Sequence, residues 1–159
     1  MILPPTTVAK LQNALPFAMS FLLIPLAVIS AIYGGWTVLL LPVMTWYMFS
    51  ILDLAVGLNT DNADLETSED DLFWYRAITM AWVPAQFLTL FGLIAYVAPA
   101  EHLNTFEKIA VFFGVGVVTG TVGINYSHEL MHQKNKLERW LGDALLAMVL
   151  YSHFRSEHL

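Results

Sequence analysis

Four of the five histidines lie in the last quarter of the chain, between Asn125 and Leu159. His128 and His132 are four residues apart, so on a helix they share one face and can bind one cation. Glu129 between them completes the string His-Glu-x-x-His, which in soluble proteins marks zinc peptidases with the glutamate as general base. The spacing therefore predicts a pair of metal ligands, but it does not select the metal.

The residue types present limit which metals such a site could bind. The chain contains no cysteine, which excludes a thiolate metal site, a disulfide framework and a cysteine nucleophile. A site rich in histidine with an oxygen donor nearby favours iron. A zinc peptidase remains an alternative hypothesis; it needs a third ligand, for which His158 or a later residue is available. The remaining alternative is a pair of buried, hydrogen-bonded histidines, which is disfavoured because ionisable groups at such membrane positions are costly and usually functional.

The composition is that of a membrane protein. Hydrophobic residues make up 57% of the chain and charged residues 13%, with a mean hydropathy of +0.61, which is far more apolar than a soluble domain. The net charge of −6 comes largely from an acidic run at residues 61–71. Because no basic patch is available to neutralise phosphates, nucleic acid is excluded as a partner.

Four stretches meet the roughly 20 apolar residues that a helix needs to cross a bilayer core of about 30 Å. They are residues 17–33, 36–54, 77–98 and 109–127. The short Gly34-Gly35 link predicts that the first two form an antiparallel hairpin. In the fourth, Gly116 and Gly120 have the spacing that allows close helix contact. The predicted fold is an all-α, polytopic membrane bundle forming one domain over residues 1–159.

The histidine region, residues 128–159, is predicted to lie on the cytoplasmic side. With four spans, the N-terminus, the 59–76 loop and the histidine region share one side, and that side holds every Lys and Arg except Lys108. We expect a multi-pass protein of a bacterial inner membrane. Residues 137–154 are predicted to form a buried or interfacial helix that returns His153 and His158 towards His132.

The ordered motifs of this region resemble one known family. They are His-Glu-Leu-Met-His at 128–132, Glu-Arg-Trp-Leu at 138–141, Tyr-Ser-His-Phe at 151–154 and Glu-His at 157–158. This run resembles the integral-membrane alkane monooxygenases, which are related to membrane fatty-acid desaturases and xylene monooxygenases. The resemblance implies two non-haem iron ions, and hydroxylation of the terminal methyl of an alkane to a 1-alkanol with O2. It also implies a membrane lipid environment and electrons from rubredoxin and rubredoxin reductase.

The resemblance also implies roles for individual residues. His128 and His132 would be metal ligands from the first histidine box, and His158 would be the first ligand from the second. His153 and Asp53 would lie near the metals without binding them, and Glu129 is the candidate catalytic residue. The basic cluster of Lys134, Lys136, Arg139 and Arg155 is the predicted docking surface for the electron donor.

The sequence departs from the family pattern where it stops. It ends one residue after His158, before the further histidines of the second box and all later boxes. We interpret it as a C-terminally incomplete copy of a longer protein, and we expect these 159 residues alone to be inactive. A non-catalytic membrane remnant that packs through its glycine-rich helix is the third hypothesis.

Overall fold

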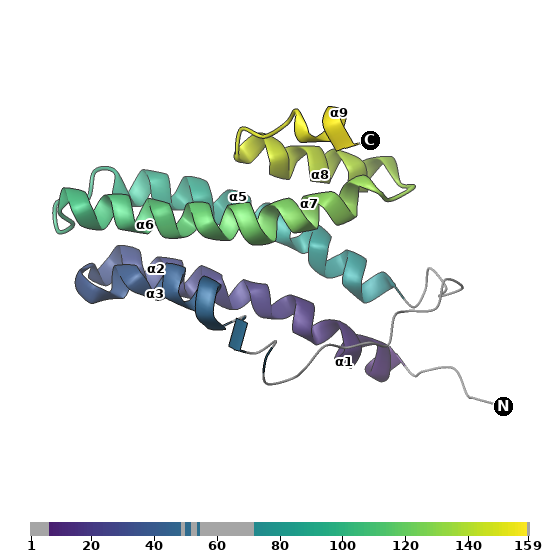
Figure 1. The fold of residues 1–159 in the computed structure, drawn as a ribbon, viewed down its shortest axis with the longest axis horizontal. Coiled ribbons are helices and arrows are strands. Elements are labelled where there is room, and N and C mark those ends of the chain that lie inside the picture. The colour runs from purple at the N-terminus through teal and green to yellow at the C-terminus, as the bar shows by residue number, and fades with distance from the viewer. Residues whose placement is uncertain (1–6, 49, 52–53, 55–71, 159) are drawn as a thin grey trace.

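The described part of the chain is a layered helical bundle (Figure 1). The computed structural model describes residues 7–48, 50–51, 54 and 72–158, and no β-strand occurs among them. Within these residues, three helices are long and apolar enough to cross a membrane: Lys10–Tyr33, Phe73–Val97 and Thr105–Met131. The predicted all-α membrane bundle is therefore confirmed.

The first span is one continuous helix built from three segments. These are α1 (Thr7–Ala18), the 3-10 turn η1 (Met19–Leu22) and α2 (Leu23–Tyr33). Leu23, Ala27 and Ala31 recur every four residues and are almost fully buried, so one face of α2 packs against the rest of the bundle. The other face carries exposed apolar side chains, as a lipid-facing surface requires.

The predicted glycine hairpin is confirmed. Gly34 and Gly35 have φ angles of 60° and 57°, a region that glycine adopts without steric cost. Beyond them η2 (Gly35–Leu39), α3 (Leu40–Val43) and the π-helical η3 (Met44–Met48) run back beside α2 (Figure 1). The end of the predicted second span, with Asp53, lies outside the described residues, as does the acidic run.

A second hairpin is formed by α5 (Phe73–Val97) and α6 (Thr105–Val118). α5 begins four residues before the predicted start at residue 77, because the aromatic and basic segment that precedes this position is itself helical. α6 begins with a capping box, in which Asn104 and Glu107 each accept a hydrogen bond from the other's backbone N–H. The same Glu107 carboxylate accepts from the Gly35 N–H at 2.6 Å, so it joins the tips of the two hairpins.

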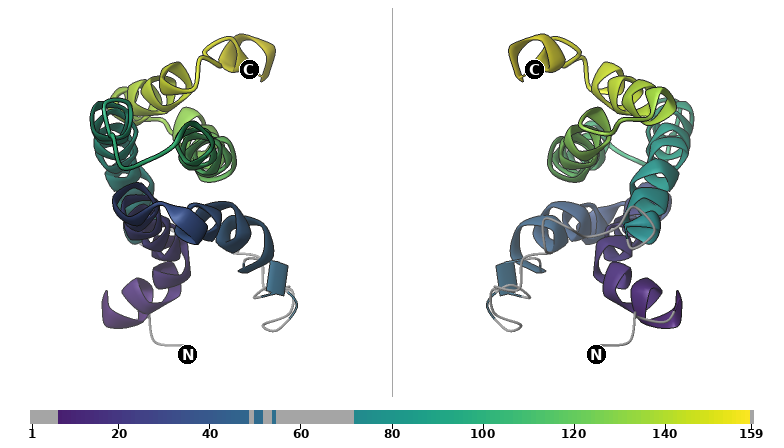
Figure 2. Two further views of the ribbon diagram at one scale, coloured as in Figure 1. Left: turned by 90° about the vertical axis from the view of Figure 1, so that its left-hand side faces the viewer. Right: turned by 90° about the vertical axis from the view of Figure 1, so that its right-hand side faces the viewer.

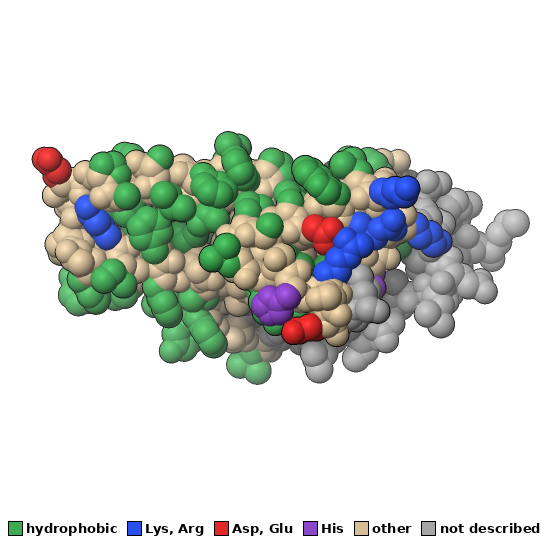
Figure 3. Space-filling view, turned by 90° about the horizontal axis from the view of Figure 1, so that it is seen from above, with side chains coloured by type: hydrophobic (Ala, Val, Ile, Leu, Met, Phe, Trp, Pro, Cys, Tyr) green, Lys and Arg blue, Asp and Glu red, His purple; other side chains and the backbone are tan. Residues whose placement is uncertain are grey.

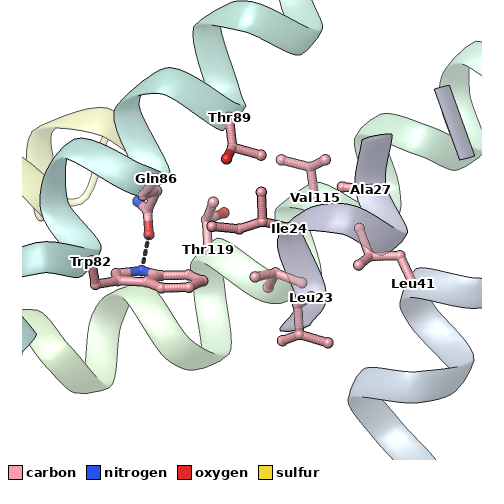
Figure 4. Close-up of a pocket in the computed structure, with 10 residues that line it drawn as sticks. Leu23, Ile24, Ala27, Leu41, Trp82, Gln86, Thr89, Val115 and Thr119 are labelled. Atoms are coloured by element: carbon pink, nitrogen blue, oxygen red, sulfur yellow. Dashed lines mark hydrogen bonds between the residues drawn. The ribbon is translucent and has the colours of Figure 1, made fainter. Parts of the chain in front are cut away.

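α6 continues through a π-helical turn, η4 (Thr119–Gly123), into α7 (Ile124–Met131). At this turn Gln86 of α5 presses against the helix so closely that a Cβ atom on Gly123 would overlap the carboxamide oxygen. That oxygen accepts a hydrogen bond from Trp82 Nε1 at 2.8 Å (Figure 4). The widened turn and the missing side chain at Gly123 together make room for a polar side chain inside the bundle.

Close helix approach occurs at other glycines than the predicted pair. Cβ atoms built at Gly116 and Gly120 would meet no atom of another part of the bundle within 4 Å among the residues described. Contact is tight instead at Gly114, where a Cβ would lie 3.1 Å from Leu41, at Gly123 and at Gly142. The predicted role of Gly116 and Gly120 is therefore wrong for this part of the chain.

The C-terminal region forms a further layer above the two hairpins (Figures 1 and 2). α8 (Lys136–Met148) folds back along α7, and α9 (Phe154–His158) lies over α8. The predicted single helix over residues 137–154 is wrong, because α8 ends at Met148. Leu150 then takes a φ of 57°, which reverses the chain direction.

Gly123→Ala is expected to destabilise the bundle by about 1–3 kcal/mol, because its methyl group would displace a carboxamide that Trp82 holds in place. The matched control is Gly120→Ala, which adds the same methyl group to the same π-helical turn in open space. Thermal unfolding of both variants in detergent measures the difference. Equal stabilities of the two variants would contradict the close contact between Gly123 and Gln86.

Candidate metal centre

His128 and His132 lie on one face at the end of α7, as their spacing predicts. Their Nε2 atoms are 3.3 Å apart and their ring centroids 4.7 Å apart. With metal–nitrogen bonds of about 2.0–2.1 Å, two such atoms subtend an angle of about 105° at a shared ion. The pair therefore fits two positions of the coordination sphere of one metal.

The opposite face of α7 is fixed against α8. Ser127 is fully buried, and its Oγ donates to the Gly142 carbonyl at 2.8 Å. The backbones meet so closely that a Cβ on Gly142 would lie 3.0 Å from the Ser127 carbonyl oxygen. Leu130 and Met131 are buried on the same face. His128 on the neighbouring side of α7 is half-buried, and His132 is exposed.

A buried ion pair ties α8 to the start of α5. Glu138 is 1% exposed, and its two carboxylate oxygens accept from Nε and Nη2 of Arg76, the first at 3.1 Å. A two-point pair of this kind fixes both distance and orientation. The pairing of Glu138 with Arg76 was not predicted from the sequence. Glu138 precedes Gly142 by four residues and Leu145 by seven, and this helical spacing indicates that its carboxylate lies on the buried face of α8 and needs a partner.

Glu129 is exposed and does not bridge the histidine pair. Its Oε1 lies 3.9 Å from Nδ1 of His128, which is too long for a hydrogen bond. The residue lines a pocket between α1, α5 and α7 that also includes Arg76 and Gln133. At 3.9 Å, the Glu129 carboxylate therefore makes no hydrogen bond to the His128 ring in this structure.

The second histidine segment comes near the first pair at Phe154, and the predicted return of His153 and His158 towards His132 stays a prediction. The Phe154 ring lies 6.5 Å from the His128 ring, and Tyr151 packs against Phe154 at 5.4 Å. His153 is exposed and its ring lies 4.6 Å from that of Tyr151. His158 ends α9, but its side chain, like Asp53, is outside the described part. Within that part, no group of three or more metal-binding side chains comes together.

Two further spaces lie within the bundle. One lies at the bundle centre among α2, α3, α5, α6 and η4, beside Trp82 and Gln86 (Figure 4). The other opens between α1, η3 and α7, and reaches Asn125, one helical turn before His128. The residues that line this second space are Pro16, Phe17, Ser20, Thr45, Thr121, Val122, Asn125 and Tyr126. Tyr126 closes one wall by donating its hydroxyl to the Phe17 carbonyl at 2.6 Å.

The fold and this geometry define an integral membrane protein that presents a histidine pair at the end of a spanning helix. Proteins of similar sequence identify the family. The chain is 31% identical over 128 residues to an alkane 1-monooxygenase of Pseudomonas putida, covering 78% of this chain and 31% of the relative. It is 32% identical over 143 residues to alkane 1-monooxygenase 2 of Pseudomonas aeruginosa, covering 85% and 33% respectively. Alkane 1-monooxygenase 1 of Alcanivorax borkumensis is 30% identical over 129 residues, covering 78% and 31%.

This chain belongs to the alkane 1-monooxygenase family. It spans about a third of the length of the curated relatives that it matches. No protein-family model matches the chain, and no solved structure matches it.

His128→Ala and His132→Ala are each expected to weaken binding of Ni²⁺ by about tenfold or more, because a lone imidazole loses the chelating partner. The measurement is a titration of the purified protein with Ni²⁺ at constant pH. The control is His102→Ala, since His102 lies at the far end of the bundle, where Nε2 is 3.1 Å from the Ala31 carbonyl oxygen. An unchanged affinity in both α7 variants would contradict a shared site.

Arg76→Ala is expected to destabilise the protein by about 3–5 kcal/mol, because it leaves the Glu138 carboxylate buried without its guanidinium partner. The double variant Arg76→Met/Glu138→Leu removes both charges and is expected to recover most of that loss. Chemical denaturation in detergent measures both. A double variant less stable than Arg76→Ala would show that the ion pair is not the main interaction of either residue.

Proposed function

We propose that the protein to which these residues belong is an alkane 1-monooxygenase, which inserts one oxygen atom of O2 into the terminal C–H bond of an alkane to give a 1-alkanol. The observation that carries the proposal is the facing Nε2 pair of His128 and His132 at the end of a membrane helix. Its support is the similarity of this chain to proteins named for that reaction.

The residues of α7 suit non-haem iron. Imidazole nitrogen is a good ligand for iron, and both Nε2 atoms are oriented towards the same space. Two bound iron ions would supply the activation of O2. His158, carried back by α9, would add a further ligand, and His153 and Asp53 would lie near the ions. Glu129 is proposed to orient His128 through Nδ1, in place of the general-base role that a peptidase would require.

The bundle would supply an apolar route for the substrate. An alkane partitions into the hydrocarbon core, so it can approach from the membrane rather than from water. The space between α1, η3 and α7 ends beside Asn125, on the helix that carries the histidines. Phe17 and Val122 would hold the alkyl chain there by apolar contact, while the Tyr126 hydroxyl stays occupied by the Phe17 carbonyl.

The histidine end is proposed to face the cytoplasm of a bacterial inner membrane. Lysine and arginine side chains gather around the turn between α7 and α8, beside histidine (Figure 3). Of the predicted docking cluster, Arg139 donates to the Gln133 and Lys134 carbonyls and Arg155 pairs with Asp143. The whole cluster of Lys134, Lys136, Arg139 and Arg155 is the proposed contact for rubredoxin, which rubredoxin reductase would keep reduced.

The test is alcohol formation by the complete gene product in lipid vesicles with NADH, rubredoxin reductase, rubredoxin and alkanes of several lengths. We expect 1-alkanols that require O2 and both electron carriers, and losses of at least about 100-fold in His128→Ala and His132→Ala. His102→Ala is the matched control and is expected to retain activity. Activity that survives both α7 substitutions would overturn the proposal.

A further inference from the structure

We propose that Asp143 and Arg155 form a latch that holds the second histidine segment, residues 151–158, against the helix that bears the first pair. The latch is the ion pair in which Arg155 Nη1 donates to Asp143 Oδ2. Its purpose rests on the proposed function, because a shared metal site needs both histidine segments together. Its existence as a positioning contact does not depend on that function.

The second segment begins a new helix, α9 (Phe154–His158), after the end of α8. It follows a reversal at Leu150, so helical continuity with α8 is interrupted. Contacts with the preceding layer therefore determine where α9 lies. They include the Tyr151 N–H donating to the Leu146 carbonyl at 2.9 Å and the latch itself.

The position of Asp143 depends on the contact between α8 and α7. Its neighbour Gly142 is the residue at which α8 meets the backbone of Ser127, and Ser127 immediately precedes His128. Asp143 is therefore linked to the proposed ligand His128 through Gly142 and Ser127. The other end of the latch, Arg155, lies within the helix that His158 terminates. The Gly142-Asp143 dipeptide consequently connects both histidine segments through α8.

A modest ion pair is sufficient for this role. Both side chains are about two-fifths exposed, so their contribution to global unfolding is small. Local opening of a segment has a lower free energy than global unfolding, however, and a small change alters the population of the open state directly. When α9 opens, Phe154 leaves the His128 ring, and the second segment moves away from the first.

The test is hydrogen exchange by mass spectrometry on the purified protein in lipid nanodiscs without added metal. Asp143→Asn and Arg155→Gln are each expected to speed exchange of residues 151–158 roughly threefold, with α5 and α6 unchanged. The reversed pair Asp143→Arg/Arg155→Asp is expected to restore exchange close to the wild-type rate. The control Glu101→Gln removes one carboxylate at the far end of the bundle and is expected to have no effect.

Wild-type exchange in Asp143→Asn, or no recovery in the reversed pair, would overturn the latch. The same proteins are then titrated with Ni²⁺, where Asp143→Asn is expected to weaken binding severalfold and the reversed pair to recover it. Faster exchange with unchanged metal affinity would overturn the purpose assigned to the latch. Absence of Ni²⁺ binding in the wild type would count against the proposed function, and the exchange result would still decide whether the latch exists.

Discussion

The close backbone approach of α7 and α8 at Ser127 and Gly142 is the contact on which the candidate site depends. A hydroxyl-to-carbonyl hydrogen bond and a missing side chain let the two helices pack with Leu130 and Met131 buried between them. Burial of these side chains sets the rotation of α7 about its own axis. That rotation sets which way His128 and His132 face, and the Phe154 ring lies 6.5 Å from the His128 ring.

Polar side chains inside the bundle act as spacers between helices. Trp82 and Gln86 form a hydrogen-bonded pair beside the π-helical turn that leads into α7, and Arg76 with Glu138 joins α5 to α8. An unpaired polar group is expensive inside a membrane, so such pairs tolerate little change in geometry. The Trp82–Gln86 pair packs against the start of α7, and the Arg76–Glu138 pair holds α8, which packs along α7. At the opposite end of the bundle, Glu107 joins the tips of the two hairpins.

Sequence patterns predicted the features that depend on local composition. Apolar length predicted the first, third and fourth spans, while the 36–54 span stays a prediction because part of it lies outside the described residues. The double glycine predicted the first hairpin, and the four-residue spacing predicted the facing histidines. Gly116 and Gly120 were misinterpreted because spacing shows which residues share a face, but not whether another helix covers that face. The end of α8 was missed because the reversal at Leu150 uses a positive φ at a residue that rarely adopts one. Neither pairing of Glu138 nor that of Asp143 is visible without the tertiary arrangement.

The metal content of the complete gene product, purified in detergent and analysed for iron and zinc, decides between the oxygenase and the peptidase chemistry. We expect two iron ions per chain, a large loss in His128→Ala and in His132→Ala, and full retention in His102→Ala. One zinc ion per chain, lost in the same two variants, would contradict the oxygenase and favour a peptidase. A protein that binds no metal would leave the histidine pair without the role assigned to it.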